Sequence, residues 1–184
     1  MALRRFDLRL ELDPPAEDLE RLRSWPARSL VPDYIVATSG STEIRFDGVP
    51  VVYRSGRFVR LAHDDNLPEG TTTLIGDYLA GFVQRLVDTL EEWADDAPRF
   101  VGFVGNPAGL HLRRAGDTAT VGYRESEEEP DLYSVVASAN EVAATIRGAA
   151  ESYHQRLLAL NPKLAYQRDV AILSVSLARL GRAE

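Results

Sequence analysis

Short alternating segments joined by tight turns occur in two series along this chain, and a helical pattern follows each series. Residues 6–12 alternate apolar and charged side chains, the period of a half-buried strand. Strand-like patterns continue from 33 to 61, where Asp47-Gly48 is a strong hairpin signal because both positions tolerate positive φ. We read Ser39-Gly40-Ser41-Thr42 as a loop from its composition. The second series is predicted at 100–104, 110–114, 118–124 and 132–136.

Four segments have helical periodicity. A short helix is predicted over 16–24 and a long one over 73–93, with Thr71 to Thr73 as candidate N-caps. Ser138 to Glu141 forms a capping-box pattern, and the helix behind it ends at Asn161-Pro162. The last helix is predicted at about 165–180, where a strand stays an alternative.

This order of elements predicts an α+β fold. Strands connected by hairpins pair in antiparallel fashion, so we expect a mainly antiparallel sheet in two meander-plus-helix halves. Helices would pack on one face, and the last two would form a C-terminal helical pair. We expect one domain over 1–184, with a weak duplication of halves at about 1–96 and 97–184.

Composition excludes several classes of function. The 184 residues include no cysteine, which rules out disulfides, thiolate metal sites and a cysteine nucleophile and fits a cytoplasmic protein. We find neither a signal peptide nor a membrane span. A net charge of −7 disfavours nucleic acid and favours a protein partner with a basic surface. Lys163 is the only lysine among 21 basic residues, which indicates a GC-rich, bacterial genome.

No motif indicates catalysis, a metal or a cofactor. His63-Asp64-Asp65 could bind a metal, but only His111 and His154 remain to complete a site, and we favour a polar loop. Gly102, Gly105 and Gly109 precede a strand rather than a helix, so we expect a turn there and not a phosphate cradle. No serine lies in a nucleophile-elbow pattern.

Two acidic clusters are the candidate binding residues. One stands at the end of the long predicted helix and the other in the loop after 118–124, where a solvated loop is the alternative reading. Their members are Glu91, Glu92, Asp95 and Asp96, and Glu125, Glu127, Glu128, Glu129 and Asp131.

These observations favour a non-catalytic acidic bacterial binding protein that docks a basic protein partner. In broad character, and without a diagnostic motif, the chain resembles immunity proteins that neutralise toxin domains. Two alternatives stay open. One is a metal-dependent or unmotified hydrolase that uses His63 or His111. The other is a self-associating scaffold, in which the apolar face of 73–93 pairs two copies as a homodimer.

Overall fold

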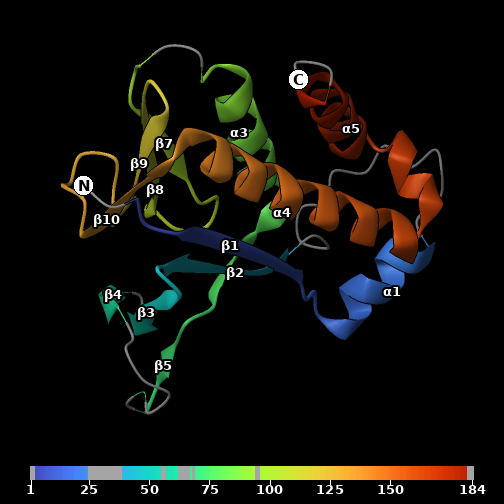
Figure 1. Cartoon of the computed structure of the whole chain (residues 1–184). Helices are drawn as coiled ribbons and strands as arrows, with labels where there is room; N and C mark the ends of the chain where they lie inside the picture. The colour runs from blue at the N-terminus through green and yellow to red at the C-terminus, as the bar shows by residue number, and fades with distance from the viewer. Residues whose placement is uncertain are drawn as a thin grey trace.

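The computed structural model describes residues 3–24, 39–54, 57–61, 67, 69–93 and 96–181, with the backbone alone at 58–60. It confirms the predicted α+β class. Two antiparallel sheets are present, helices pack against them, and two helices stand together at the C-terminal end (Figure 1). The predicted strand at 34–36 lies outside the described residues.

The first sheet is built on one long antiparallel pair. β1 (Phe6–Leu12) runs beside β2 (Ser39–Phe46), from the pair Phe6 and Phe46 to the pair Leu12 and Gly40. The predicted Asp47-Gly48 hairpin follows, with φ of 54° and 79°. It leads into β3 (Val49–Arg54) and β4 (Arg57–Leu61). β5 (Thr71–Thr72) pairs with β3, and β6 (Ile75–Tyr78) pairs with β2.

The second sheet is the predicted meander. Its strand order is β10-β9-β8-β7, and the predicted boundaries hold to within two residues. The strands are β7 (Arg99–Gly102), β8 (Gly109–Ala115), β9 (Thr118–Arg124) and β10 (Tyr133–Ser138).

The helices cover one side of this framework. α1 (Ala16–Ser24) follows β1, and α3 (Leu79–Glu91) connects the two sheets. α4 (Ala139–Leu160) begins at the predicted cap, where the Glu141 amide donates to the Ser138 hydroxyl at 3.4 Å, and Asn161 is its C-cap. A 3-10 turn (Pro162–Tyr166) then leads to α5 (Arg168–Leu180), which lies beside α3 (Figure 1).

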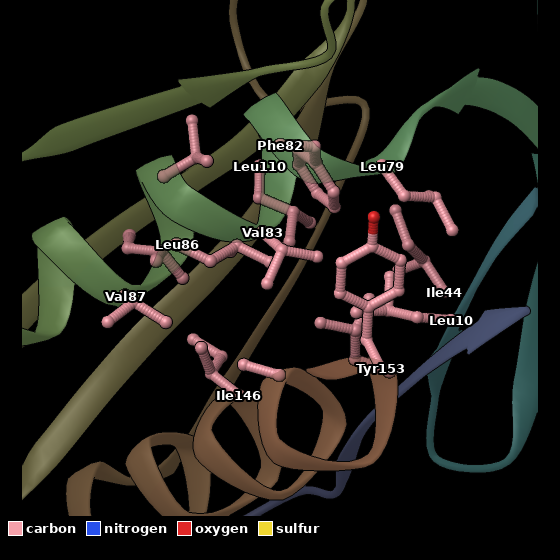
Figure 2. Packing of buried hydrophobic residues seen from close by; sticks show 14 of the residues in the cluster. Leu10, Ile44, Leu79, Phe82, Val83, Leu86, Val87, Leu110, Ile146 and Tyr153 are labelled. Carbon is pink, nitrogen blue, oxygen red and sulfur yellow. The ribbon is translucent and has the colours of Figure 1, made fainter. Parts of the chain in front are cut away.

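One hydrophobic cluster joins both halves of the chain. Figure 2 shows Leu10 and Ile44 from the first sheet, Leu110 from the second, and Phe82 and Tyr153 from α3 and α4 around the same interior. Each is less than 5% exposed. Full burial of such a side chain stabilises the fold by about 1.5–3 kcal/mol. The core therefore depends on contacts between segments far apart in the sequence.

Three predictions were wrong in this region. The helix predicted over 73–93 begins only at Leu79, because Ile75–Tyr78 pairs with β2 as a strand. The threonines do not cap it, and Thr73 instead donates to Glu43. The segment 39–42 is strand and not loop. Its glycine is needed there, since a Cβ at Gly40 would collide with the Glu11 carbonyl oxygen.

Candidate functional site

The acidic loop 125–131 connects β9 to β10 at one end of the second sheet. Glu127, Glu128 and Glu129 are exposed, and Glu125 is half-buried. Within the described residues, none of the three exposed glutamates takes part in an ion pair. Leu132, directly after the loop, is 46% exposed and adds an apolar side chain beside the acidic ones.

Asp131 differs from the other acidic residues of the loop, because its carboxylate is bound internally. The Arg124 Nε donates to Asp131 Oδ1 at 2.6 Å. His111 Nδ1 lies 3.2 Å from each carboxylate oxygen and 3.0 Å from the Arg124 Nη2. The three side chains are only 13–21% exposed. We call His111, Arg124 and Asp131 the loop clamp.

Gly122 makes the loop clamp sterically feasible. It stands opposite His111 in the strand pairing, and a Cβ at this position would lie 2.5 Å from the Asp131 carboxylate carbon. Such a distance is not tolerated, so the carboxylate fits over the sheet only because residue 122 lacks a side chain. The loop is further held by a hydrogen bond from the Leu132 amide to the Tyr123 carbonyl at 2.8 Å.

The second acidic cluster is partly neutralised. Glu91 lies 3.7 Å from an Arg179 guanidinium nitrogen, and Glu92 lies 3.3 Å from one of Arg99. Asp96 is exposed, whereas Asp95 lies outside the described residues. Strand pairing also separates the clusters, because 91–96 precedes the start of β7 while 125–131 follows the end of β9, at the opposite end of the sheet.

The predicted glycine turn between β7 and β8 is present, and it binds an internal carboxylate. The Gly105 amide donates to Asp77 Oδ1 at 2.7 Å, and the Val104 amide lies 3.0 Å from both oxygens. Asp77 is buried and comes from β6, so this contact ties the first sheet to the second. The amides that could have bound a phosphate are therefore occupied by the protein itself.

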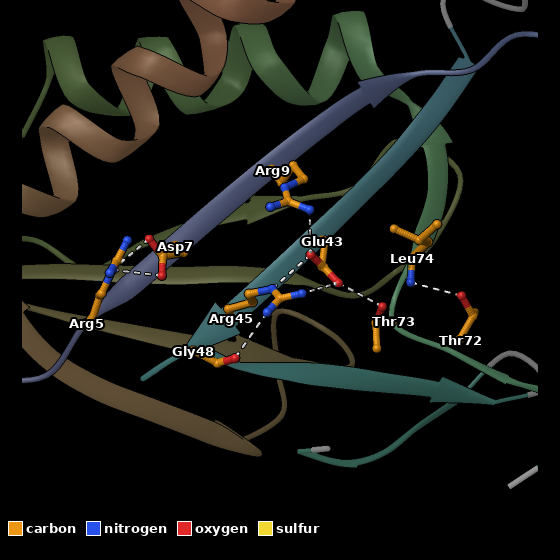
Figure 3. Close-up of polar contacts among 9 residues, drawn as sticks. All are labelled: Arg5, Asp7, Arg9, Glu43, Arg45, Gly48, Thr72, Thr73 and Leu74. Atoms are coloured by element: carbon orange, nitrogen blue, oxygen red, sulfur yellow. Dashed lines mark hydrogen bonds and ion pairs between the residues drawn. The ribbon is translucent and has the colours of Figure 1, made fainter. Parts of the chain in front are cut away.

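A third carboxylate is bound on the outer face of the first sheet (Figure 3). Glu43 accepts from Arg45 Nε at 2.9 Å, from Arg45 Nη2 at 3.1 Å and from Thr73 Oγ1 at 2.8 Å. Burial alone would raise the pKa of Glu43, but the hydrogen bonds and the charges of Arg45 and Arg9 outweigh it and lower the pKa. Glu43 is thus kept ionised as a structural contact.

The two histidines that the structure describes are both engaged in contacts within the protein. His63 lies outside the described residues, and His111 belongs to the loop clamp. His154 Nε2 lies 2.7 Å from Ser174 Oγ, whose own hydrogen is donated to the Val170 carbonyl. A hydroxyl that donates to a carbonyl of its own helix can accept from the imidazole, and this arrangement is a structural contact between α4 and α5. Burial lowers the pKa of His154, which favours the neutral form of the imidazole.

Neither a metal site nor a membrane segment is found in the described parts of the chain. No three His, Asp or Glu side chains are grouped there as metal ligands. No described helix has the length and apolar character needed to cross a bilayer. Comparisons with protein-family models, with curated proteins and with solved structures give no match to this chain.

The sequence predicts the five acidic residues of the loop as candidate binding residues but does not predict the clamp that holds the loop. The sequence pattern groups Asp131 with the other acidic residues, whereas in the structure it pairs with Arg124 and lies 3.2 Å from His111. The strand pattern carries one signal of the clamp. Alternation along β8 and β9 puts His111, Gly122 and Arg124 on the face opposite the buried Leu110, Val121 and Tyr123.

Proposed function

We propose that this chain is a non-catalytic bacterial binding protein that docks a basic protein partner through the loop 125–131, in the manner of a toxin-neutralising immunity protein. The observation that carries the proposal is the loop clamp. One carboxylate of the loop accepts a hydrogen bond from Arg124 and lies beside His111, while Glu127, Glu128 and Glu129 stay exposed next to it.

A held loop favours binding for a thermodynamic reason. Ordering a loop during association costs free energy, and a loop that is already ordered in the free protein avoids most of that cost. Charged side chains at the rim of an interface mainly accelerate association with an oppositely charged partner. The net charge of −7 acts in the same direction over longer distances.

The test needs a partner, and proteins encoded by adjacent genes are the first candidates. Association rates would be measured by biolayer interferometry for the wild type and for a Glu127→Lys, Glu128→Lys, Glu129→Lys variant. We expect the association rate to fall by about tenfold or more at low salt, and the difference to shrink as salt is added.

A variant of equal total charge controls for the long-range effect. Glu11, Glu17 and Glu20 are exposed on β1 and α1, away from the loop, and reversing all three changes the net charge by the same amount. This variant should lose much less of the association rate. If adjacent gene products do not bind, or if both variants associate equally fast, the proposed docking loop is wrong.

A further inference from the structure

A groove of about 900 Å³ lies where the ends of α3, β8 and α5 meet the first half of α4. Leu90, Ala143 and Leu180 supply apolar walls. Gly148 of α4 opens the groove, because a Cβ built at this residue meets no atom within 4 Å. Pockets for small molecules have volumes of about 300–1,000 Å³ and are mostly apolar with a few polar groups.

Arg114 is a half-buried cation in this groove. The alternation of β8 puts it on the helix-covered side of the sheet, together with Leu110 and Leu112. Its Nε donates to the Gly116 carbonyl at 2.9 Å, but within the described residues no carboxylate pairs with the guanidinium. A guanidinium without a carboxylate partner can offer charge-assisted, bidentate hydrogen bonds to a carboxylate or sulfonate.

Trp93 lines the same groove and is 4% exposed, and its indole nitrogen has no acceptor among the described residues. The carboxylates of the groove are already engaged, Glu151 by Arg147 at 3.0 Å and Glu91 by Arg179 at 3.7 Å. The Arg114 guanidinium and the Trp93 indole N–H are therefore hydrogen-bond donors that an anion at this site could use.

We propose that this groove binds a small organic anion, a carboxylate or sulfonate attached to an apolar body. The anionic group pairs with Arg114, and the apolar body lies over Gly148 between Leu90 and Leu180. This site is separate from the loop 125–131 and does not depend on the proposed docking function.

The experiment is a titration of the full chain with 8-anilinonaphthalene-1-sulfonate, followed by the fluorescence of this aromatic sulfonate. We expect one saturable site. Arg114→Met should weaken binding by about tenfold, since it removes a charge-assisted contact and keeps the apolar stem. Gly148→Leu should abolish binding by filling the groove, and the open space around this residue lets the variant fold.

Arg113→Met is the matched control, because Arg113 neighbours Arg114 on the opposite, exposed face of β8. It should bind the probe like the wild type. Octanoate should displace the probe, and octanol should displace it much less. The proposal is overturned if no saturable site is found, if Gly148→Leu or Arg114→Met binds like the wild type, or if octanol competes as well as octanoate.

Discussion

The outer faces of the two sheets each carry a carboxylate held by an arginine, but the two carboxylates come from different kinds of segment. Glu43 lies within β2, and its side chain is 7% exposed. Asp131 lies in the loop before β10, and its side chain is 20% exposed. Glu43 joins its own strand to Thr73, near the start of β6, whereas Asp131 fixes a loop that projects from the sheet.

The difference indicates two roles: Glu43 stabilises the sheet, whereas Asp131 positions a loop whose other acidic side chains are exposed. Around Glu43, Arg45 forms two hydrogen bonds with the carboxylate, Thr73 adds a third, and Arg9 lies 3.7 Å away, so the charges are compensated locally. Around Asp131, one carboxylate is compensated while the three glutamates beside it remain exposed. An arginine–carboxylate contact thus neutralises the charge at Glu43, whereas at Asp131 it leaves the neighbouring glutamates exposed and charged.

The largest effect is expected at Asp77, which connects the two regions. Asp77→Ala would leave the amides of Val104 and Gly105 without their acceptor. Hydrogen bonds to a charged group contribute about 1.5–3 kcal/mol each, so we expect the free energy of unfolding in urea to fall by about 3 kcal/mol. Asp77→Asn keeps one acceptor oxygen, so its free energy of unfolding should lie between those of the wild type and Asp77→Ala. A loss below about 1 kcal/mol for Asp77→Ala would contradict this role.

The next largest effect tests the loop clamp by a substitution that leaves His111, Arg124 and Asp131 themselves unchanged. Gly122→Ala places a methyl group against the Asp131 carboxylate and should cost about 2 kcal/mol through overpacking. Cleavage of the native protein by a glutamate-specific protease should accelerate at Glu127–Glu129, because the loop is released. Gly148→Ala is the control, since it adds a methyl group in open space on a helix and should stabilise by about 0.5–1 kcal/mol. Unchanged loop cleavage in Gly122→Ala would show that the clamp does not hold the loop.

The sequence predicts the second region better than the first. Each strand of the β7–β10 meander is short, alternating and bounded by turn residues, so local pattern and tertiary pairing agree. In the first sheet, Ile75–Tyr78 carries the apolar spacing of a helix, and only its pairing with β2 makes it a strand. A pairing between segments this far apart leaves no local signal.

In the candidate site too, the features that depend on long-range pairing are not visible in the sequence. The glutamates are visible in the sequence because charge is a property of each residue alone. The clamp depends on the register between β8 and β9, which brings His111 opposite Gly122, and on a loop that folds back over both. The sequence therefore shows which residues are acidic but not which of them is half-buried and paired.

A pH titration distinguishes the structural carboxylate from the exposed ones. Because the pKa of Glu43 is lowered in the folded protein, its stabilising contribution is complete above the unfolded value of 4.5 and is lost as the pH falls through the lowered pKa. Glu43→Gln removes this contribution, so its free energy of unfolding should be lower by about 1–2 kcal/mol near pH 7 and converge with the wild type in acid. Glu128→Gln should leave the curve unchanged. A constant offset between wild type and Glu43→Gln at all pH values would refute the assignment.

The smallest effect is expected at Arg9, and it measures how much of the Glu43 site depends on hydrogen bonding rather than on nearby charge. Arg9 approaches Glu43 only to 3.7 Å and its side chain is 63% exposed, whereas Arg45 forms two hydrogen bonds with the same carboxylate. Exposed ion pairs of this kind contribute about 0–1 kcal/mol, so Arg9→Met should change the free energy of unfolding by less than about 0.5 kcal/mol. Arg45→Met should cost more, about 1–2 kcal/mol, because it removes charge-assisted hydrogen bonds from a buried acceptor. Equal losses for the two variants would mean that Glu43 is stabilised by the positive charge around it, and its resemblance to the hydrogen-bonded Asp131 would then be superficial.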